Sequence, residues 1–392
     1  MNHRDVVVTG IGIVSAIATN REDTWQRLLA GRSGIKLDGS ANLPIPLAQI
    51  HELNESLQPQ KLTRSQSFLE TAVLEAIADA GLEIPLPNCG LAIGSSRSNQ
   101  REIEILLDQG LHSLKPATKS INWQQLQAAS LSAHIANLLH TQAPISSPMA
   151  ACATANWAIA QAVMLIQSGQ WDLAIAAATD APITPLTIAG FAKIGVLATT
   201  GVYPFSRERQ GFALGEGAAA LVLESRESAQ RRQTAIYGKV LGWGITNDAY
   251  HATSPAPDNH LAAIALKGCL TRSSIFANQV GYINLHGTAT MLNDAREADL
   301  ISKYLPDFLP NLALSATKGA TGHTLGSTGM MEAAFCLLAL RDRLLPPTVG
   351  LLTPDFDLPI VKSRQRSPHL QYALNFSFGF GGQNAIIAFG VD

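Results

Sequence analysis

The sequence has few cysteines and few charged residues, and each shortage argues against a class of protein. Its four cysteines lie far apart, and no Cys-x-x-Cys pair occurs. This spacing argues against a disulfide framework and a zinc site, so we expect free thiols, a reducing compartment and no metal. Charged residues make up 15% of the 392, with 28 basic side chains against 30 acidic ones. Such a balance offers no basic field, so we expect no nucleic acid and no membrane as partners.

Long apolar runs are also missing. No stretch of about 18 apolar residues occurs, so we expect no transmembrane helix. The apolar run over residues 6–17 is interrupted by Gly10 and Gly12 and lacks the flanks of a signal peptide. We interpret it as a strand and turn, and we expect a cytoplasmic protein. Hydrophobic residues nevertheless make up 46% of the chain, which is typical of a globular protein with a large core.

Strand-like and helix-like segments alternate along the chain, which predicts an α/β fold with buried sheets. A polar, arginine-rich stretch over residues 225–234 separates two halves of similar rhythm, and we predict domains at 1–230 and 231–392. Helices are expected at 23–30 (with Asp23 as N-cap), 65–80, 125–139, 157–168, 261–273, 294–304 and 327–341, and strands at 5–8, 91–94, 145–150, 173–178, 217–223, 235–243, 279–285, 312–315, 374–378 and 385–389.

Cys152 lies where the expected strand 145–150 turns into a helix, and we place it in the first turn of that helix. A helix N-terminus stabilises a thiolate, and such a turn exposes a side chain at the sheet edge where α/β proteins bind ligands. Two interpretations stay open at this point. Cys152 is either a nucleophile or a small buried apolar residue, as most cysteines are.

Two histidines and a lysine follow other expected strands. His286 ends one strand, and Lys318 and His323 follow another. Both histidines could donate to one developing oxyanion, although each could equally be a satisfied polar residue in a turn. Glu332 lies on the next helix, where we expect it to pair with Lys318. The glycine-rich segment 378–382 is either a tight hairpin turn or a backbone N–H aimed at a thioester oxygen, and it lacks the pattern of a phosphate loop.

Taken together, these motifs resemble those of the chain-elongating β-ketoacyl-[acyl carrier protein] synthases, the Cys-His-His condensing enzymes of the thiolase superfamily. The resemblance implies a thiolase-like fold, in which two duplicated βαβαβαββ halves form five layers, α-β-α-β-α, usually as a homodimer. The motifs that carry it are Val6–Gly12, Ala151–Thr154, Gly211–Ala218, His286–Thr290 with Asn293 and Asp294, Lys318 with Thr321–His323, and Phe378–Asn384.

The resemblance also implies the chemistry. Cys152 would take the acyl group from a donor acyl carrier protein. His286 and His323 would bind the thioester oxygen of malonyl carrier protein and stabilise the enolate formed on decarboxylation. The helix start would activate the thiol, so that no base needs to contact it. No cofactor of its own is implied, because the phosphopantetheine arrives on the carrier protein.

Other roles follow from the same resemblance. The backbone N–H groups of Cys152 and Phe380 would form the oxyanion hole. Lys318 completes the catalytic set, with Glu332 as its structural-electrostatic partner. Asp248 and His251 match a mobile loop at the site entrance. The residues expected to bind substrate are Thr288, Thr290, Phe212, Phe378 and Phe380.

The sequence departs from the family pattern at several positions. Met291 replaces a common proline, Phe376 replaces a common Ser or Asn, and Asn284-Leu285 replaces Glu-Ala before His286. The segment 198–205 is shortened and lacks an arginine that docks the carrier protein, which leaves Lys61 and Arg64 as docking cations. The shortened segment and Phe376 favour a specialised pathway over general fatty-acid elongation.

Three functions are weighed. Decarboxylative condensation in fatty-acid or polyketide-type synthesis is favoured. A non-decarboxylative thiolase would need a second cysteine near the C-terminus, and the C-terminal loop has none. A partner-dependent subunit of the ketosynthase or chain-length-factor type, working as a heterodimer with a ketosynthase-like chain, is the other alternative, although chain-length factors typically lack the nucleophile.

Overall fold

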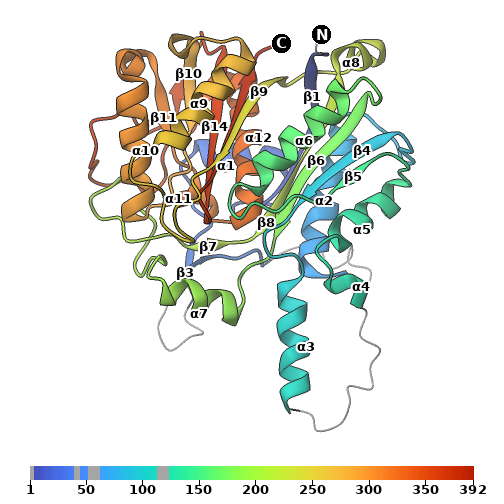
Figure 1. The fold of residues 1–392 in the computed structure, drawn as a ribbon, viewed down its shortest axis with the longest axis horizontal. Coiled ribbons are helices and arrows are strands. Elements are labelled where there is room, and N and C mark those ends of the chain that lie inside the picture. The colour runs from blue at the N-terminus through green and yellow to red at the C-terminus, as the bar shows by residue number, and fades with distance from the viewer. Residues whose placement is uncertain (1–3, 39–44, 52–61, 113–122) are drawn as a thin grey trace.

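The computed structural model describes residues 4–38, 45–51, 62–112 and 123–392. Within them, ten strands form one mixed sheet built from two halves (Figure 1). The first half contains β1 (Val6–Val14), β4 (Cys89–Gly94), β5 (Ile145–Ser146), β6 (Leu173–Asp180) and β8 (Gly217–Ser225). The second contains β9 (Gly238–Asn247), β10 (Val280–Asn284), β11 (Ala313–Ser315), β14 (Tyr372–Gly379) and β15 (Gln383–Gly390).

Both halves have the same topology. The strand order across the sheet is β5-β4-β6-β8-β1 and then β9-β15-β14-β10-β11. In each half the first strand pairs antiparallel with the last, and the three remaining strands run parallel to one another. The halves meet where β1 pairs with β9 at Val7–Lys239 and Val8–Gly238. This repeat agrees with the expected duplication, and the boundary that we predicted near residue 230 falls in α8 (Arg226–Arg232).

Helices form three layers around these strands, as the thiolase-like fold requires. The central layer is α6 (Thr154–Gln167) and α12 (Thr328–Asp342), which contact strands of both halves. The outer face of the first half carries α2 (Arg64–Asp79) and α5 (Ser130–Leu139). The outer face of the second half carries α9 (His260–Ser273) and α10 (Met291–Tyr304).

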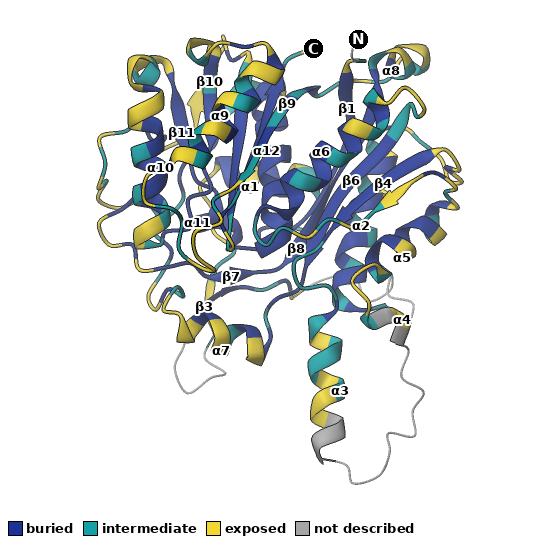
Figure 2. Ribbon diagram, in the orientation of Figure 1, coloured by how far each residue is buried: buried dark blue, intermediate teal, exposed yellow. Residues whose placement is uncertain are grey.

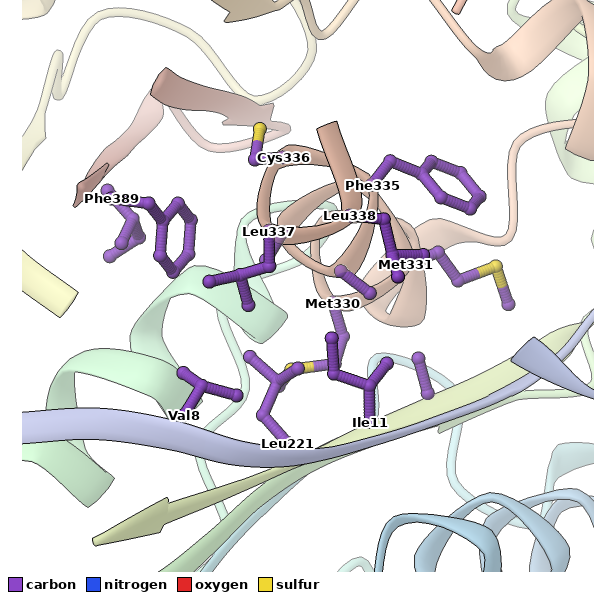
Figure 3. Close-up of a cluster of buried hydrophobic side chains, with 14 of the residues drawn as sticks. Val8, Ile11, Leu221, Met330, Met331, Phe335, Cys336, Leu337, Leu338 and Phe389 are labelled. Atoms are coloured by element: carbon purple, nitrogen blue, oxygen red, sulfur yellow. The ribbon is translucent and has the colours of Figure 1, made fainter. Parts of the chain in front are cut away.

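The central helix α12 is apolar on every side because both of its faces are covered. Every residue from Thr328 to Leu340 is buried. Figure 3 shows Met330 and Leu337 on this helix, pointing towards Leu221 and Val8 of the sheet. In Figure 2 the strands and the middle helices are buried, and the exposed residues lie on the outer helices and loops. The core therefore fixes the ends of both half-sheets relative to each other.

The remaining elements are short or peripheral. The helices are α1 (Arg21–Leu29), α3 (Gln100–His112), α4 (Trp123–Leu126), α7 (Pro185–Lys193) and α11 (Lys318–Thr321), with 3-10 turns η2 (Ala277–Gln279), η3 (Pro306–Asn311) and η4 (Leu325–Ser327). The strands are β2 (Lys36–Asp38), β3 (Ile45–Ala48), β7 (Leu214–Gly215), β12 (Leu344–Leu345) and β13 (Gln365–Arg366). In the part of the chain that the structure describes, no helix has the length and apolar character to cross a membrane.

Two helix predictions are wrong in detail. The N-cap of α1 is Asn20, whose side chain accepts from the N–H of Asp23, so Asp23 lies inside the helix. The helix expected over 125–139 is broken into α4 and α5 by a turn at residues 127–129. There the Ser130 hydroxyl accepts from Asn99, which ties the start of α5 to the loop after β4 and competes with a continuous helix.

The strand expected over 145–150 is also too long, because β5 ends at Ser146. Two residues after this end lies Pro148, which has no backbone N–H to donate to β4, so the pairing cannot continue. The chain then reaches Cys152 through an irregular segment.

The strand expected over 5–8 is too short, because β1 continues through the expected turn to Val14. Gly10 and Gly12 serve close packing on α2 instead of a turn, since a Cβ there would lie 2.1 Å from Ala76 O and 1.9 Å from Ala72 O. The remaining expected helices and strands are found within a few residues of their predicted bounds.

Candidate active site

A tight turn presents Cys152 to the site. Ala151 has a positive φ of 48°, and the hydroxyl of Thr154 accepts from Ala150 N at 2.8 Å and donates to Ala151 O at 2.6 Å. Helix α6 begins at Thr154 with Ala153 as its N-cap, so Cys152 precedes the helix. Our prediction that Cys152 lies in the first turn of this helix is therefore wrong. It still lies close to the partial positive charge at the helix start.

The three residues singled out from the sequence converge. Nε2 of His323 lies 3.2 Å from Sγ of Cys152. The ring centroids of His286 and His323 are 5.4 Å apart, with the rings nearly perpendicular. The sulfur and one nitrogen of each ring all lie within 4.8 Å of one another. Because β10, β11 and β14 are parallel, their carboxyl ends deliver His286, Lys318 and Phe378 to one edge, opposite the turn of Cys152.

The loop of His286 is held by two carboxylates that sequence reasoning did not assign. Glu297 accepts from the N–H groups of His286 at 2.7 Å and Gly287 at 2.6 Å. Asp294 accepts from Ala289 N at 3.1 Å. Burial raises the pKa of Glu297 to about 7 and that of Asp294 to about 6. Both lie in the first turns of α10, where acidic residues can accept hydrogen bonds from the N–H groups of a preceding loop. This position in the sequence could have indicated their role.

Lys318 and Glu332 form the expected ion pair. Nζ of Lys318 lies 2.6 Å from Oε1 of Glu332, and both side chains are buried. Nζ also donates to the carbonyl oxygen of His286. Burial raises the pKa of Glu332 to about 7, against the opposing effect of Lys318. Such a pair costs desolvation and therefore points to a positioning role rather than to stability.

Both histidines are held neutral. Burial, followed by the charge of Lys318, holds the pKa of His286 and of His323 well below the usual range. Nδ1 of His323 bonds to the hydroxyl of Thr328 at 3.1 Å, and its ring packs edge-on against Phe212 at 4.9 Å. Neutral imidazoles in fixed orientations suit hydrogen-bond donation to a developing oxyanion.

The thiol of Cys152 is not activated by the helix alone. Burial raises its pKa to about 11, and the charge of Lys318 and the N–H of Phe380 act in the opposite direction. The contact with Nε2 of His323 corrects our expectation that no base touches the thiol. This contact could not be foreseen from the sequence, because it depends on how the turn after α11 aims His323.

The glycine-rich segment is a hairpin turn between β14 and β15, and it packs directly on the turn of Cys152. A Cβ on Gly379 would lie 3.1 Å from Cys152 N and 2.9 Å from Ala150 O, so a side chain there would displace the nucleophile. Gly381 and Gly382 have φ angles near +79° and +78°. The N–H of Phe380 lowers the pKa of the Cys152 thiol and so lies near the sulfur, and its place in an oxyanion hole stays a prediction.

A pocket of about 240 Å³ opens over this group. Asp248 and His251 do not line it, although Thr253–Pro255 of the same loop do. Asp248 is instead buried against Arg296, and His251 is exposed and accepts from Thr253 N at 3.1 Å. The predicted residues that line the pocket are Cys152, Phe212, His286, Thr288, Thr290, His323, Phe378 and Phe380.

One of the docking cations that we proposed is engaged inside the protein. Arg64 forms an ion pair with Glu216 and donates to Ile50 O, because the start of α2 places it against that carboxylate. Lys61 lies outside the described residues. Phe376 is fully buried and packs against Phe378 at 5.9 Å, so it shapes the core beneath the site and does not line the pocket.

The thiol and the two ring nitrogens are also the one group, among the described residues, spaced so that it could hold a metal ion. A Cys-His-His set suits zinc. A metal there would take the sulfur and both donor nitrogens, so metal binding and nucleophilic use of Cys152 exclude each other.

Comparisons with known proteins agree with this geometry. The family models for the β-ketoacyl synthase N-terminal and C-terminal domains match residues 3–229 and 237–352. The 3-oxoacyl-[acyl-carrier-protein] synthase 2 of Staphylococcus aureus is 34% identical over 410 residues, covering 99% of this chain and 98% of that protein. The protein with the same name from Synechocystis sp. is 34% identical over 414 residues, with coverage of 99% and 98%.

Solved structures give the same result. A chain of "the ishigamide ketosynthase/chain length factor" superposes with a TM-score of 0.92 at 28% identity and covers all of both chains. A chain of the complex described as a "type II PKS acyl-carrier protein in complex with its ketosynthase bound to the hexaketide" superposes with a TM-score of 0.92 at 27% identity, again over the full length of both chains.

Proposed function

The chain belongs to the β-ketoacyl synthase family, and we propose that it joins an acyl group carried on Cys152 to malonyl-acyl carrier protein by decarboxylative Claisen condensation. The product is a β-ketoacyl-acyl carrier protein, in fatty-acid or polyketide-type synthesis. The observation that carries this proposal is the convergence of the Cys152 sulfur, the two neutral histidines and the Phe380 N–H in one pocket. We also propose that the reaction takes place in the cytoplasm.

The first half-reaction loads the enzyme. Nε2 of His323 lies close enough to accept the thiol proton, and Sγ of Cys152 attacks the carbonyl of the acyl thioester. The oxyanion that forms is stabilised by the N–H groups of Cys152 and Phe380. The carrier thiolate leaves and takes up a proton, while His323 gives up its Nδ1 proton through the Thr328 hydroxyl. His323 is then neutral again and keeps the former thiol proton on Nε2, where it can donate in the next step.

The second half-reaction makes the carbon–carbon bond. Neutral His286 and His323 donate hydrogen bonds to the thioester oxygen of the malonyl group, so that carbon dioxide leaves and the electron pair stays as an enolate. The enolate carbon attacks the acyl carbonyl on Cys152. The same two backbone N–H groups stabilise the new oxyanion, and the Cys152 thiolate leaves. We propose no cofactor beyond the phosphopantetheine that arrives with the carrier protein.

We propose that Thr288 and Thr290 bind that phosphopantetheine arm. Their hydroxyl oxygens are 3.0 Å apart, and both residues line the pocket that also holds the two histidines. Phe212 and Phe378 hold the rings of His323 and His286 by edge-on contacts at 4.9 Å and 6.1 Å. The arm would thus meet hydroxyl groups and rigid aromatic walls in one pocket.

A thiolase reading is weaker in this structure. Apart from Cys152, the cysteines are Cys89, Cys269 and Cys336, and all three are buried in the hydrophobic core clusters. No second thiol is therefore placed to act as a base beside Cys152. The partner-dependent alternative keeps specific support, because a structural relative is described as a ketosynthase "in complex with its chain length factor". A homodimer and such a heterodimer are both proposed assemblies.

Mass spectrometry after incubation with acyl and malonyl carrier protein tests the proposal. We expect an acyl adduct on Cys152 and a product that is two carbons longer. An absent adduct, or the same adduct in Cys152→Ala, would contradict the proposed function. Acylation without elongation would favour the partner-dependent subunit.

A further inference from the structure

The opening of the site pocket is bordered by apolar side chains that face solvent. Ile194 ends α7, Met291 and Leu292 begin α10, and all three line the pocket. Their exposed fractions are 45%, 56% and 63%. Apolar side chains gathered in the open around a cavity are typical of a contact surface. We call these three residues the apolar rim.

Free charge is scarce around the same opening. Among the described residues that line the pocket, Arg296 is the one side chain of Lys, Arg, Asp or Glu. Its guanidinium is bound to Asp248 at 3.1 Å and to Asn384 at 2.8 Å, and it is 8% exposed. Just outside the lining, Lys193 precedes Ile194 and is exposed, and the half-buried Arg97 stacks on the ring of Phe191 at 5.3 Å. Among the described residues, a partner that approaches this opening therefore meets apolar surface and few cations.

The rim is continuous with the path to the nucleophile. Thr290 caps α10 by accepting from Asn293 N, which turns Met291 and Leu292 outward while Thr288 and Thr290 line the pocket. A thioester arm that reaches Cys152 past the two threonines must enter beside the rim. The protein that holds this arm must then sit on the rim. A second copy of this chain seated there would close the pocket to substrate, so a transient partner is favoured.

We propose that the apolar rim of Ile194, Met291 and Leu292 is the docking surface for the carrier protein, and that docking depends on apolar burial more than on ion pairs. This inference rests on the proposed function and adds to it the mode of carrier recognition. Methionine suits such a surface because its flexible, polarisable side chain adapts to a partner.

The double variant Met291→Ser/Leu292→Ser tests the rim. With acyl carrier protein as donor, we expect KM to rise by about tenfold, because apolar contact area is lost. With acyl-pantetheine, which has no protein to dock, we expect the rise in KM to be smaller by a factor of about five or more. Ile194→Ser provides a second, independent variant. Phe276→Ser is the matched control, since Phe276 is 76% exposed and lies at the opposite end of β10 from His286.

Salt separates apolar from ionic docking. Raising the salt from about 0.05 M to about 0.5 M screens surface charges, and we expect KM for the carrier protein to change by less than about threefold. A tenfold rise, a larger effect of Lys193→Ala than of the double variant, or equal losses with both donors would overturn the proposal. Calorimetry of carrier binding gives the same comparison without turnover, so a failure of the proposed chemistry is distinguishable from a failure of the rim.

Discussion

Nε2 of His323 lies 3.2 Å from Sγ of Cys152, while Nδ1 of the same ring bonds to the Thr328 hydroxyl at 3.1 Å. The ring is therefore fixed from both sides and can exchange a proton with the thiol without turning. Its low pKa keeps it neutral in the resting enzyme. One histidine thus serves the acylation step and the enolate step in sequence, whereas His286 serves the enolate step alone.

The first prediction concerns the pH dependence of the thiol. Because burial raises the pKa of Cys152 to about 11, the thiolate fraction should climb steadily with pH. We expect alkylation by iodoacetamide to accelerate from about pH 7 to about pH 9 without a plateau, as only the thiolate reacts. Peptide mass spectrometry at each pH measures this rate at Cys152.

Lys318→Met provides the comparison for that profile. Removing the cation takes away its favourable effect on the thiolate, so alkylation at a given pH should slow. An unchanged or faster rate would mean that Lys318 does not act on the thiol through its charge. Circular dichroism checks that the variant folds, since Glu332 loses its partner in the core.

The second prediction concerns Gly379. Gly379→Ala would place a Cβ 3.1 Å from Cys152 N, beside the proposed oxyanion hole, and 2.9 Å from Ala150 O. We expect kcat to fall by about a hundredfold or more, the cost of losing one such donor, and the melting temperature to fall as well, because the backbone around Cys152 must shift. Steady-state kinetics with both substrates measures the loss.

Gly268→Ala is the matched control for the glycine substitution. Gly268 lies inside α9, and an added Cβ would meet nothing within 4 Å. Activity should be retained, and stability should rise by up to about 1 kcal/mol because alanine is the better helix former. A comparable loss of kcat in both variants would show that the effect of Gly379→Ala is not specific to the site.

The third prediction concerns the loop of His286. Glu297→Ala leaves the N–H groups of His286 and Gly287 without their carboxylate. We expect a loss of about 2–4 kcal/mol in the free energy of unfolding, because hydrogen bonds to a charged group are lost inside the protein. Denaturant unfolding measures it.

In Glu297→Ala, the rate of decarboxylation of malonyl carrier protein should fall more than the rate of acylation of Cys152, because His286 serves only the enolate step. Glu297→Gln, which keeps one acceptor oxygen, should recover part of both losses. Equal losses of the two half-reactions would contradict a positioning role for Glu297.

The chemistry could be predicted from the sequence where it depends on local motifs. Cys152, His286 and His323 come six, two and eight residues after the ends of β5, β10 and β11, and parallel strands bring such positions together. The role of Glu297 was missed because its partners, the N–H groups of His286 and Gly287, become visible only once α10 folds back on its own loop.

Long-range pairing explains the other differences. Arg64 looked free because Glu216, its ion-pair partner, lies 152 residues away in the sequence. The break between α4 and α5 depends on a contact of Ser130 with Asn99. Neither relation leaves a periodic signal, since both depend on which elements become neighbours in the fold.

The division of labour between the thiol and the histidines is tested most directly by measuring two products in the same samples. With acyl and malonyl carrier protein together, Cys152→Ala should still release carbon dioxide but form no acyl adduct. His286→Ala should form the adduct on Cys152 but release little carbon dioxide, and neither variant should give the elongated product. Adduct formation in Cys152→Ala, or undiminished decarboxylation in His286→Ala, would contradict the account.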